Sequence, residues 1–264
     1  MTTTGPNRVA GRTALVTGAG NGLGRVIALA LARSGARVML IGRTEPTLTA
    51  VATEIASLTG DDARARVCLA DTSAPDDVQR LAAELAGEDV SILVNNAGVA
   101  GPVAALVDID PQDWDDVFAV NVRGVYLICR AFLPPMIAAG RGDVINLASV
   151  SGKRPLARRT PYTASKMAVI GLTTTLAHEV GPLGVAVNSL SPGPVRGPRM
   201  TRNFRLEAER TGGTPAEAEQ TFVSRAALGR MVEEGEVADA VIAMLHMPGL
   251  AGADIDLSAG MSAR

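Results

Sequence analysis

Cysteine and histidine are scarce in this chain of 264 residues, which contains two of each. Cys68 and Cys129 both lie in apolar runs without the spacing of metal ligands, so we expect them to be small core residues. His178 and His246 have no candidate ligand beside them in the sequence, and we therefore expect no metal site. So few cysteines also fit a reducing compartment.

Long hydrophobic runs are also missing, because no stretch of about 18 apolar residues is present to cross a membrane. The polar residues 1–10 lack the basic region and apolar core of a signal peptide. We therefore expect a cytoplasmic protein with no membrane partner. The net charge of −2 lacks the basic field typical of nucleic-acid binders, so we expect no nucleic-acid partner either.

Short apolar runs alternate along the chain with stretches of helical periodicity. Runs that are apolar nearly throughout, separated by helices, indicate a parallel sheet covered on both faces. The predicted strands are residues 13–17, 37–41, 65–70, 90–94, 143–148, 185–190 and 254–257, and the predicted helices are 22–34, 45–58, 75–86, 113–139, 162–180 and 234–246. With no linker-like segment, residues 1–264 are predicted to form a single α/β domain. We expect a doubly wound Rossmann-type fold with a sheet of about seven strands.

Residues 194–227 break this alternation, because they are rich in glycine, proline and charge. They follow the end of a predicted strand, where open α/β sheets bind their ligands. Long irregular segments in compact domains are usually functional or disordered. We predict a substrate lid here, with one short helix near residues 215–224.

The first predicted strand leads directly into Gly18-Ala19-Gly20-Asn21-Gly22-Leu23-Gly24, and a helix follows. Glycines let the backbone turn sharply and approach a pyrophosphate closely. The helix N-terminus then presents free N–H groups to that anion. Because a strand precedes the loop and a helix follows it, a dinucleotide site is favoured over a purely structural turn.

The end of the second predicted strand indicates which dinucleotide is bound. An acid there would accept hydrogen bonds from a free ribose 2′-OH and repel a 2′-phosphate. This chain has Gly42, followed by Arg43, which can hold a phosphate, and Thr44, which can donate to it. Glu45 is a competing acid, but before Pro46 it is better placed in the first turn of a helix. The sequence favours NADP(H) over NAD(H).

Tyr162 and Lys166 are four residues apart in a predicted helix, so they share one helix face. Hydride transfer between an alcohol and a nicotinamide needs a matching proton donor or acceptor. A cation held near a phenol favours the phenolate. An isolated pair with this spacing is common on solvated helices, but Ser149 lies 13 residues earlier at the end of a predicted strand and strengthens the interpretation.

These motifs resemble, in their order and spacing, the short-chain dehydrogenase/reductase family. The resemblance covers about residues 10–260 and rests on TGxxxGxG from Thr17, NNAG from Asn95, the YxxxK of Tyr162 and Lys166, and Pro192-Gly193. It implies that Ser149 orients the substrate oxygen and that Tyr162 is the general acid in reduction and the base in oxidation. It also implies that Lys166 activates Tyr162 and binds the ribose, and that Asn121 fixes a water linking Lys166 to solvent. Simpler alternatives are a turn residue for Ser149 and a helix-kink residue for Asn121.

The resemblance also implies a set of cofactor contacts. Asp71 is expected to meet the adenine, although a helix cap is an alternative that Ser73 could serve better. Gly197 stands where the family often has a threonine that touches the nicotinamide carboxamide. Without that side chain, the contact expected there is from the backbone of Val195. Asn21 stands where some NADP enzymes carry a basic residue. Together with the phosphate contacts proposed above, the predicted cofactor-binding residues are Gly18, Asn21, Gly22, Leu23, Gly24, Arg43, Thr44, Asp71, Thr72, Asn95, Ala97, Gly98, Tyr162, Lys166, Pro192, Gly193 and Val195.

Basic residues cluster between Ser149 and Tyr162 and in the predicted lid. A solvated loop surface is the simpler interpretation. The alternative is recognition of an anionic substrate such as a carboxylate, a phosphate or an acyl-carrier group. The residues concerned are Lys153, Arg154, Arg158, Arg159, Arg196, Arg199, Arg202 and Arg205.

The expected activity is hydride transfer between NADP(H) and a ketone or secondary alcohol, as in a 3-oxoacyl reductase or a small carbonyl reductase. An NAD-dependent polyol or sugar dehydrogenase is the main alternative. A dinucleotide-binding regulator without catalysis is a more distant one, since Tyr162 and Lys166 are both present. The resemblance further implies a homotetramer or homodimer formed through the helices at residues 113–139 and 162–180.

Overall fold

A computed structural model describes residues 7–154 and 156–261, so most of the polar segment 1–10 lies outside the described residues. Within those ranges, seven parallel strands form one sheet in the order β3-β2-β1-β4-β5-β6-β7. The strands are β1 (Thr13–Thr17), β2 (Arg37–Gly42), β3 (Ala65–Leu69), β4 (Val90–Asn95), β5 (Gly142–Leu147), β6 (Val185–Pro192) and β7 (Asp254–Leu257). The order reverses between β1 and β4, so the predicted doubly wound fold is confirmed.

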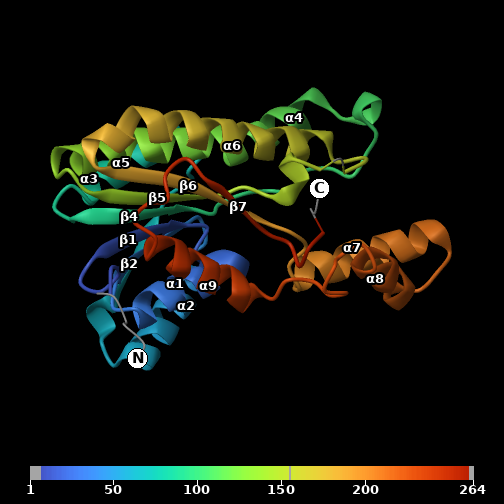
Figure 1. The fold of residues 1–264 in the computed structure, drawn as a ribbon, viewed down its shortest axis with the longest axis horizontal. Helices are drawn as coiled ribbons and strands as arrows, with labels where there is room; N and C mark the ends of the chain where they lie inside the picture. Colours follow the sequence, from blue (N-terminus) through green and yellow to red (C-terminus); the bar gives the residue numbers. More distant parts are fainter. Residues whose placement is uncertain (1–6, 155, 262–264) are drawn as a thin grey trace.

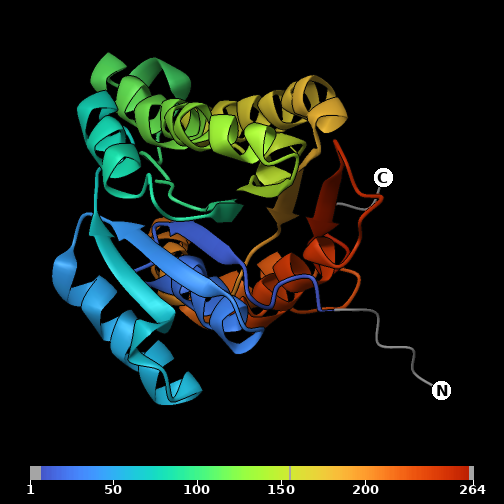
Figure 2. The ribbon, with the colours of Figure 1, turned by 90° about the vertical axis from the view of Figure 1, so that its left-hand side faces the viewer.

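Helices cover both faces of this sheet (Figures 1 and 2). Side chains alternate between the faces along each strand, so Ala14 and Val16 join one apolar core while Leu15 joins the other. Helices α1 (Gly22–Arg33), α2 (Glu45–Thr59) and α9 (Glu234–Leu245) pack on the first face, and α3 (Pro75–Glu84), α5 (Gly124–Ala138) and α6 (Thr160–Val180) on the second. Except for α5, the predicted boundaries of these strands and helices agree with the structure to within two residues.

The helix predicted over residues 113–139 is not continuous. It consists of α4 (Pro111–Phe118), a π-helical turn at Ala119–Arg123, and α5. The π turn contains Asn121, which is buried. Such turns are frequent at functional sites, and a one-residue shift in hydrogen bonding leaves the apolar periodicity almost unchanged, which is why the pattern did not predict it. By length and composition Pro111–Ala138 could cross a membrane, but half of its most apolar window is buried, as in a core helix.

The predicted lid contains more helix than expected. The short helix near residues 215–224 is confirmed as α8 (Pro215–Val223), but α7 (Pro198–Thr211) replaces a stretch that was predicted to be irregular. Pro198 lies in the first turn of α7 and Gly212 ends it with a φ of 72°, so these residues bound a helix and do not break one. Both helices lie at one end of the molecule, beyond the carboxyl ends of the strands (Figure 1).

Both cysteines are buried free thiols, as predicted. Burial raises the pKa of Cys68 to about 11 and that of Cys129 to about 12, so neither supplies a thiolate at neutral pH. Among the described residues, no three His, Cys, Asp or Glu side chains come together to hold a metal ion.

Candidate active site

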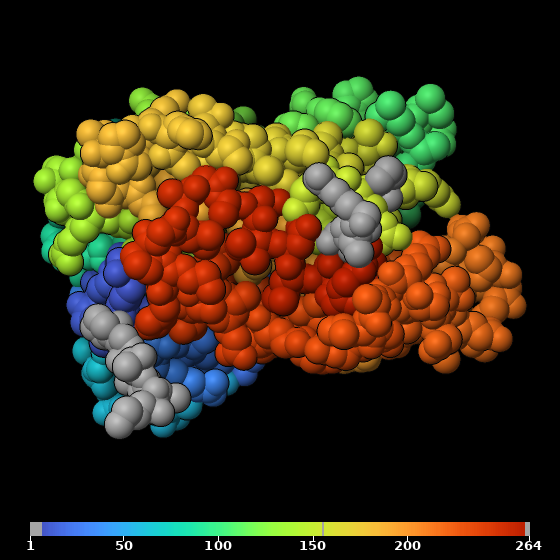
Figure 3. Space-filling model, viewed as in Figure 1, coloured from blue at the N-terminus to red at the C-terminus, as the bar shows by residue number. Residues whose placement is uncertain are grey.

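A cavity of about 1580 Å³ lies at the carboxyl ends of the strands and is bordered by α7 and α8. Figure 3 shows the C-terminal residues, in red, beside the orange α7–α8 segment on one face of the molecule. Most residues predicted from the sequence line this cavity: Gly18, Asn21, Gly22, Leu23, Arg43, Thr44, Asp71, Thr72, Ala97, Gly98, Ser149, Tyr162, Lys166, Pro192, Gly193 and Val195. Gly24, Asn95 and Asn121 do not line it.

The glycine loop has the backbone shape that a pyrophosphate requires. Gly18 and Gly22 have φ values of 67° and 49°, which favour glycine. A Cβ at Gly24 would lie 2.1 Å from the carbonyl oxygen of Gly18, so Gly24 shapes the loop from behind. Asn21 makes no capping hydrogen bond to α1, which leaves the first N–H groups of the helix available to an anion. The loop therefore fits the diphosphate of a dinucleotide.

The two asparagines at the end of β4 point in different directions. Asn95 Nδ2 donates to Asn146 Oδ1 at 2.8 Å inside the protein, so its side chain supports the sheet and does not reach the cavity. Asn96, which was not among the residues predicted from the sequence, donates from Nδ2 to the Thr17 carbonyl at 2.9 Å. Its backbone N–H also donates to Thr17 Oγ1 at 3.0 Å, which ties the loop after β4 to the end of β1. The sequence signal that could have identified Asn96 is its position as the second asparagine of the NNAG motif.

Arg43 and Asp71 meet where the adenine end of a dinucleotide is expected. Arg43 Nη1 lies 3.5 Å from Asp71 Oδ2, and the Arg43 side chain is 68% exposed. Burial opposes ionisation of Asp71, but the hydroxyl and N–H of Ser73 and the charge of Arg43 together hold its pKa below the ordinary value. Neither Asp71 nor Ser73 caps α3, because the residue at the N-cap is Ala74. Asp71 therefore lines the cavity and caps no helix there.

Lys166 is buried beneath Tyr162 on α6. Its Nζ donates a hydrogen bond to the Leu147 carbonyl at 2.6 Å and lies 5.9 Å from the centroid of the Tyr162 ring. Burial, with a smaller contribution from the charge of Arg199, lowers the pKa of Lys166 to about 8. The ammonium is therefore close to its titration point near neutral pH.

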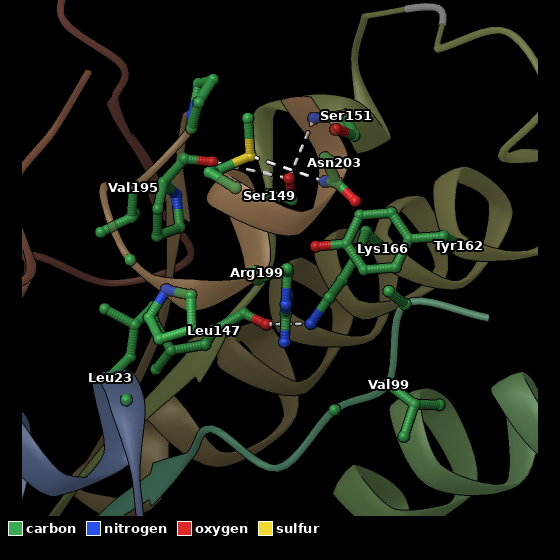
Figure 4. A pocket seen from close by; sticks show the side chains of 18 of the residues that line it. Leu23, Val99, Leu147, Ser149, Ser151, Tyr162, Lys166, Val195, Arg199 and Asn203 are labelled. Carbon is green, nitrogen blue, oxygen red and sulfur yellow. Dashed lines mark hydrogen bonds between the residues drawn. The ribbon is translucent and has the colours of Figure 1, made fainter. Parts of the chain in front are cut away.

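Ser149 begins a short 3-10 turn after β5, across the cavity from Tyr162. Its Oγ accepts from the Ser151 N–H at 3.1 Å and donates to the Pro192 carbonyl at 3.5 Å. Figure 4 shows that the Ser149 hydroxyl and the Tyr162 hydroxyl face the same space. A carbonyl oxygen placed there would be reached by both hydroxyl groups.

Asn121 is buried next to this site and does not line the cavity. Its Oδ1 accepts from the Val99 N–H at 2.8 Å, and its Nδ2 donates to the Val99 carbonyl at 2.9 Å and to Ser165 Oγ at 3.0 Å. Ser165 in turn donates to the Tyr162 carbonyl at 2.8 Å. Asn121 therefore joins the loop after β4 to the first turns of α6. Ser165 was not selected from the sequence.

The basic residues divide into two groups. Lys153 is ion-paired with Asp254 and Asp256, and Arg196 with Glu219 and Glu233. Arg202 and Arg205 line a second hollow beside the main cavity. These four do not present a free charge to the main cavity, as the interpretation of a solvated surface expects. Arg196 also lines the main cavity, but its charge is already paired. Among the described residues, the predicted basic residues that line this cavity without an ion pair are Arg154, Arg158, Arg159 and Arg199, and Arg225, which was not selected from the sequence, joins them.

Two of these arginines lie near the Tyr162–Lys166 pair. Arg159 is held by hydrogen bonds from Nη1 to the Ala100 carbonyl at 3.3 Å and from Nη2 to Asn203 Oδ1 at 3.2 Å. Burial lowers its pKa, and the charge of Arg199 adds to that effect. Arg199 makes no ion pair within the described part of the chain. The cavity thus holds positive charge that the protein itself does not neutralise.

A dinucleotide-shaped loop beside a Ser–Tyr–Lys set defines a nicotinamide-dependent oxidoreductase acting on CH–OH and C=O groups. A family model described as short chain dehydrogenase matches residues 12–209. The chain belongs to the short-chain dehydrogenase/reductase family, whose members bind nicotinamide dinucleotides.

Relatives from this family differ in substrate and cofactor. The chain is 37% identical over 240 residues to the granaticin polyketide synthase putative ketoacyl reductase 1 of Streptomyces violaceoruber, covering 88% of this chain and 86% of that protein. A single-residue variant of the actinorhodin polyketide ketoreductase with NADPH is 28% identical with a TM-score of 0.89, covering 97% of this chain and 99% of that one. NAD+-bound xylitol dehydrogenase is 27% identical with a TM-score of 0.88, covering 96% and 99%.

Proposed function

We propose that this protein interconverts a ketone and a secondary alcohol with NADP(H), using Tyr162 to move the proton. The observation that carries the proposal is the position of Lys166, buried under the Tyr162 ring with Ser149 facing the same space. A bound nicotinamide supplies the hydride in reduction and accepts it in oxidation. The remaining chemistry is proton transfer and alignment by the residues of the chain.

In reduction, the Tyr162 hydroxyl gives its proton to the substrate oxygen. Ser149 Oγ, fixed by the Ser151 N–H, holds that oxygen toward Tyr162. The phenolate that remains is stabilised by the Lys166 ammonium, whose position is set by the Leu147 carbonyl. In oxidation the same groups act in reverse, with Tyr162 as the base. Asn121 and Ser165 keep the first turns of α6 in register with this site.

Arg43 supports the preference for NADP(H). Gly42 leaves the end of β2 without an acid, and Arg43 with Thr44 lines the cavity there. The ion pair with Asp71 leaves N–H donors of Arg43 available, because a guanidinium has five donors and this side chain is largely exposed. A 2′-phosphate would give it a second anionic partner. The NAD+-bound xylitol dehydrogenase among the similar structures keeps an NAD-linked polyol dehydrogenase as the competing function.

The cavity lining supports a substrate with both an anionic and an apolar part. Arg159 and Arg199 lie near the reacting groups, and Met200 and Phe204 add apolar surface from α7. We propose a keto acid or an acyl group on an anionic carrier, in line with the ketoacyl reductase relative. We also propose a homodimer or homotetramer, because Tyr126 on α5 and Met167 on α6 expose apolar surface.

A panel of ketones and alcohols, assayed with both cofactors through the absorbance of the reduced nicotinamide, tests the proposal. The panel pairs charged and neutral compounds of equal chain length. We expect a higher kcat/KM with NADPH than with NADH, and with a keto acid than with its neutral ester. Equal or better use of NADH would refute the cofactor assignment, and no turnover of any pair would refute the activity.

A further inference from the structure

Three glutamates at the start of α9 have different surroundings. Glu233 is ion-paired with Arg196 at 3.0 Å, and Glu236 with Arg230 at 2.7 Å. Glu234, between them in sequence, makes no hydrogen bond or ion pair to any residue in the described ranges. It lines the large cavity, whereas Glu233 and Glu236 do not. A carboxylate without a partner, facing a ligand cavity, suggests that its partner is part of the ligand.

The Glu234 carboxylate lies between two loops that converge on the cavity. A Cβ at Gly197 would lie 3.2 Å from Glu234 Oε1, and a Cβ at Gly22 would lie 3.9 Å from the same atom. Gly22 is where the pyrophosphate is expected. The carbonyl of Pro192, the last residue of β6 before the loop to Gly197, accepts from Ser149 at the reacting end of the cavity. The nicotinamide half of a dinucleotide that spanned these two points would pass beside Glu234. The carboxylate also occupies the space that a side chain at Gly197 would use.

Val195 supplies the complementary group. The bonds that flank it run from the Arg196 N–H to the Val232 carbonyl at 2.8 Å and from the Val232 N–H to the Pro194 carbonyl at 3.0 Å. In such a parallel bridge the N–H of Val195 itself faces away from Val232. Val195 and Glu234 both line the cavity, so the unpaired face of Val195 and the Glu234 acceptor border the same space. A primary carboxamide presents one acceptor and one donor group, which matches this pair.

We propose that Glu234 is a cofactor-positioning residue that replaces the side chain missing at Gly197. Its carboxylate accepts a hydrogen bond from the carboxamide NH2 of the nicotinamide, while the Val195 N–H donates to the carboxamide oxygen. Together they fix which face of the ring is presented to the substrate. The inference depends on the proposed function, because it requires that the cavity binds a nicotinamide dinucleotide.

The carboxylate also has an unfavourable effect that makes the proposal testable. A negative charge close to the pyrophosphate site repels the dinucleotide. If repulsion were its only effect, removal of Glu234 would tighten the binding of every dinucleotide equally. If it accepts from the carboxamide, removal weakens binding selectively, for those dinucleotides that carry the NH2 group.

The test compares the dissociation constants of NADP+ and of its 3-acetylpyridine analogue, in which a methyl group replaces the carboxamide NH2. Binding is measured by calorimetry without substrate, so no turnover is needed. We expect the wild type to bind the analogue about tenfold or more weakly, as for the loss of a hydrogen bond to a charged group. Glu234→Ala should reduce this difference to about threefold or less, and Glu234→Gln, which keeps a carbonyl acceptor, should retain part of it.

Glu233→Ala is the matched control, because it removes a neighbouring carboxylate that does not line the cavity. It should keep the wild-type preference for NADP+. An unchanged preference in Glu234→Ala, or equally tighter binding of both ligands, would overturn the role of Glu234 and leave the proposed function standing. If the wild type binds neither NADP+ nor NAD+, the proposed function fails, and the inference fails with it.

Discussion

Lys166 Nζ lies 5.9 Å from the centroid of the Tyr162 ring and is held by the Leu147 carbonyl at 2.6 Å. The bond joins α6 to the end of β5, so the cation has a fixed place under the phenol. Because Ser149 follows β5 two residues after Leu147, the same strand end positions both the cation and the group that faces the substrate oxygen. This relationship underlies the predictions for Tyr162 and Lys166.

Tyr162→Phe is expected to lower kcat by about a hundredfold or more, because the variant lacks the proton that is transferred with the hydride. Dinucleotide binding should remain intact, as calorimetry can show. Tyr126→Phe is the control, since Tyr126 is the other of the two tyrosines and is exposed on α5. Turnover close to wild type in Tyr162→Phe would refute its role.

Lys166 should leave a signature in the pH dependence of stability. Its pKa is lowered to about 8 in the folded protein, whereas an unfolded lysine titrates near 10.4. Between these pH values the unfolded state binds more protons, so the contribution of Lys166 to the free energy of unfolding rises with pH, by up to about 3 kcal/mol. Denaturant titrations of wild type and Lys166→Met from pH 7 to 10.5 measure this as the difference between the two proteins.

Lys153 provides the control for that experiment. Burial opposes its charge, but the carboxylates of Asp254 and Asp256 raise its pKa above the ordinary value. Its contribution to stability is therefore present at neutral pH and is lost as the pH rises through its raised pKa. Over the same range of pH 7 to 10.5, the stability difference between the wild type and Lys153→Met should therefore stay nearly constant, and it should fall only above that range. A flat difference for Lys166→Met would show that Lys166 is not desolvated as the structure indicates.

Arg43→Ala is expected to lower kcat/KM with NADPH by roughly 10- to 100-fold, since it removes a charged donor to the 2′-phosphate. The value with NADH should change by about threefold or less, because NADH lacks that phosphate. Arg80→Ala removes an exposed arginine that pairs with Asp77 outside the cavity, and it should affect neither cofactor. Equal losses with both cofactors would assign Arg43 to the adenine and remove the support for NADP(H).

Gly42→Asp tests the same preference from the other direction. A Cβ at Gly42 would lie 3.3 Å from Leu48 Cδ2, the end of a flexible side chain, so the substitution should be accommodated. The new carboxylate would repel a 2′-phosphate and accept from a 2′-OH. We expect the ratio of kcat/KM for NADPH to that for NADH to fall by about tenfold or more. An unchanged ratio would place the ribose elsewhere.

Arg199→Ala is expected to raise KM for an anionic substrate by about tenfold and to leave KM for a neutral analogue unchanged. The wild-type KM for the anion should rise with salt, and this dependence should weaken in the variant, because screening acts on the same interaction. Arg205→Ala is the matched control, because Arg205 lines the second hollow and not the main cavity. A KM that is independent of salt in the wild type would favour the solvated-surface interpretation.

The strands and most helices were predictable because their signals are local. Apolar runs, helical periodicity, and residues such as Pro75 and Gly60 that bound helices act over a few residues. The helix α7 was missed because glycine and proline were interpreted as marking a loop, although here they stand at helix ends. For a related reason the sequence could not separate Asn95 from Asn96: one motif covers both, although neighbouring side chains at the end of a strand point to opposite faces.

By itself the sequence determined the parallel sheet, the glycine loop and the pairing of Tyr162 with Lys166, because each depends on residues close together in the chain. Only the tertiary structure decided which charges remain free at the site. Lys153 pairs with Asp254, Arg196 pairs with Glu219, and Glu234 lies beside Gly197. These residues are far apart in the sequence, so no local pattern predicts the contacts. The physical reason is that the balance of charge in a cavity depends on contacts between distant elements, which form only when the helices pack onto the sheet.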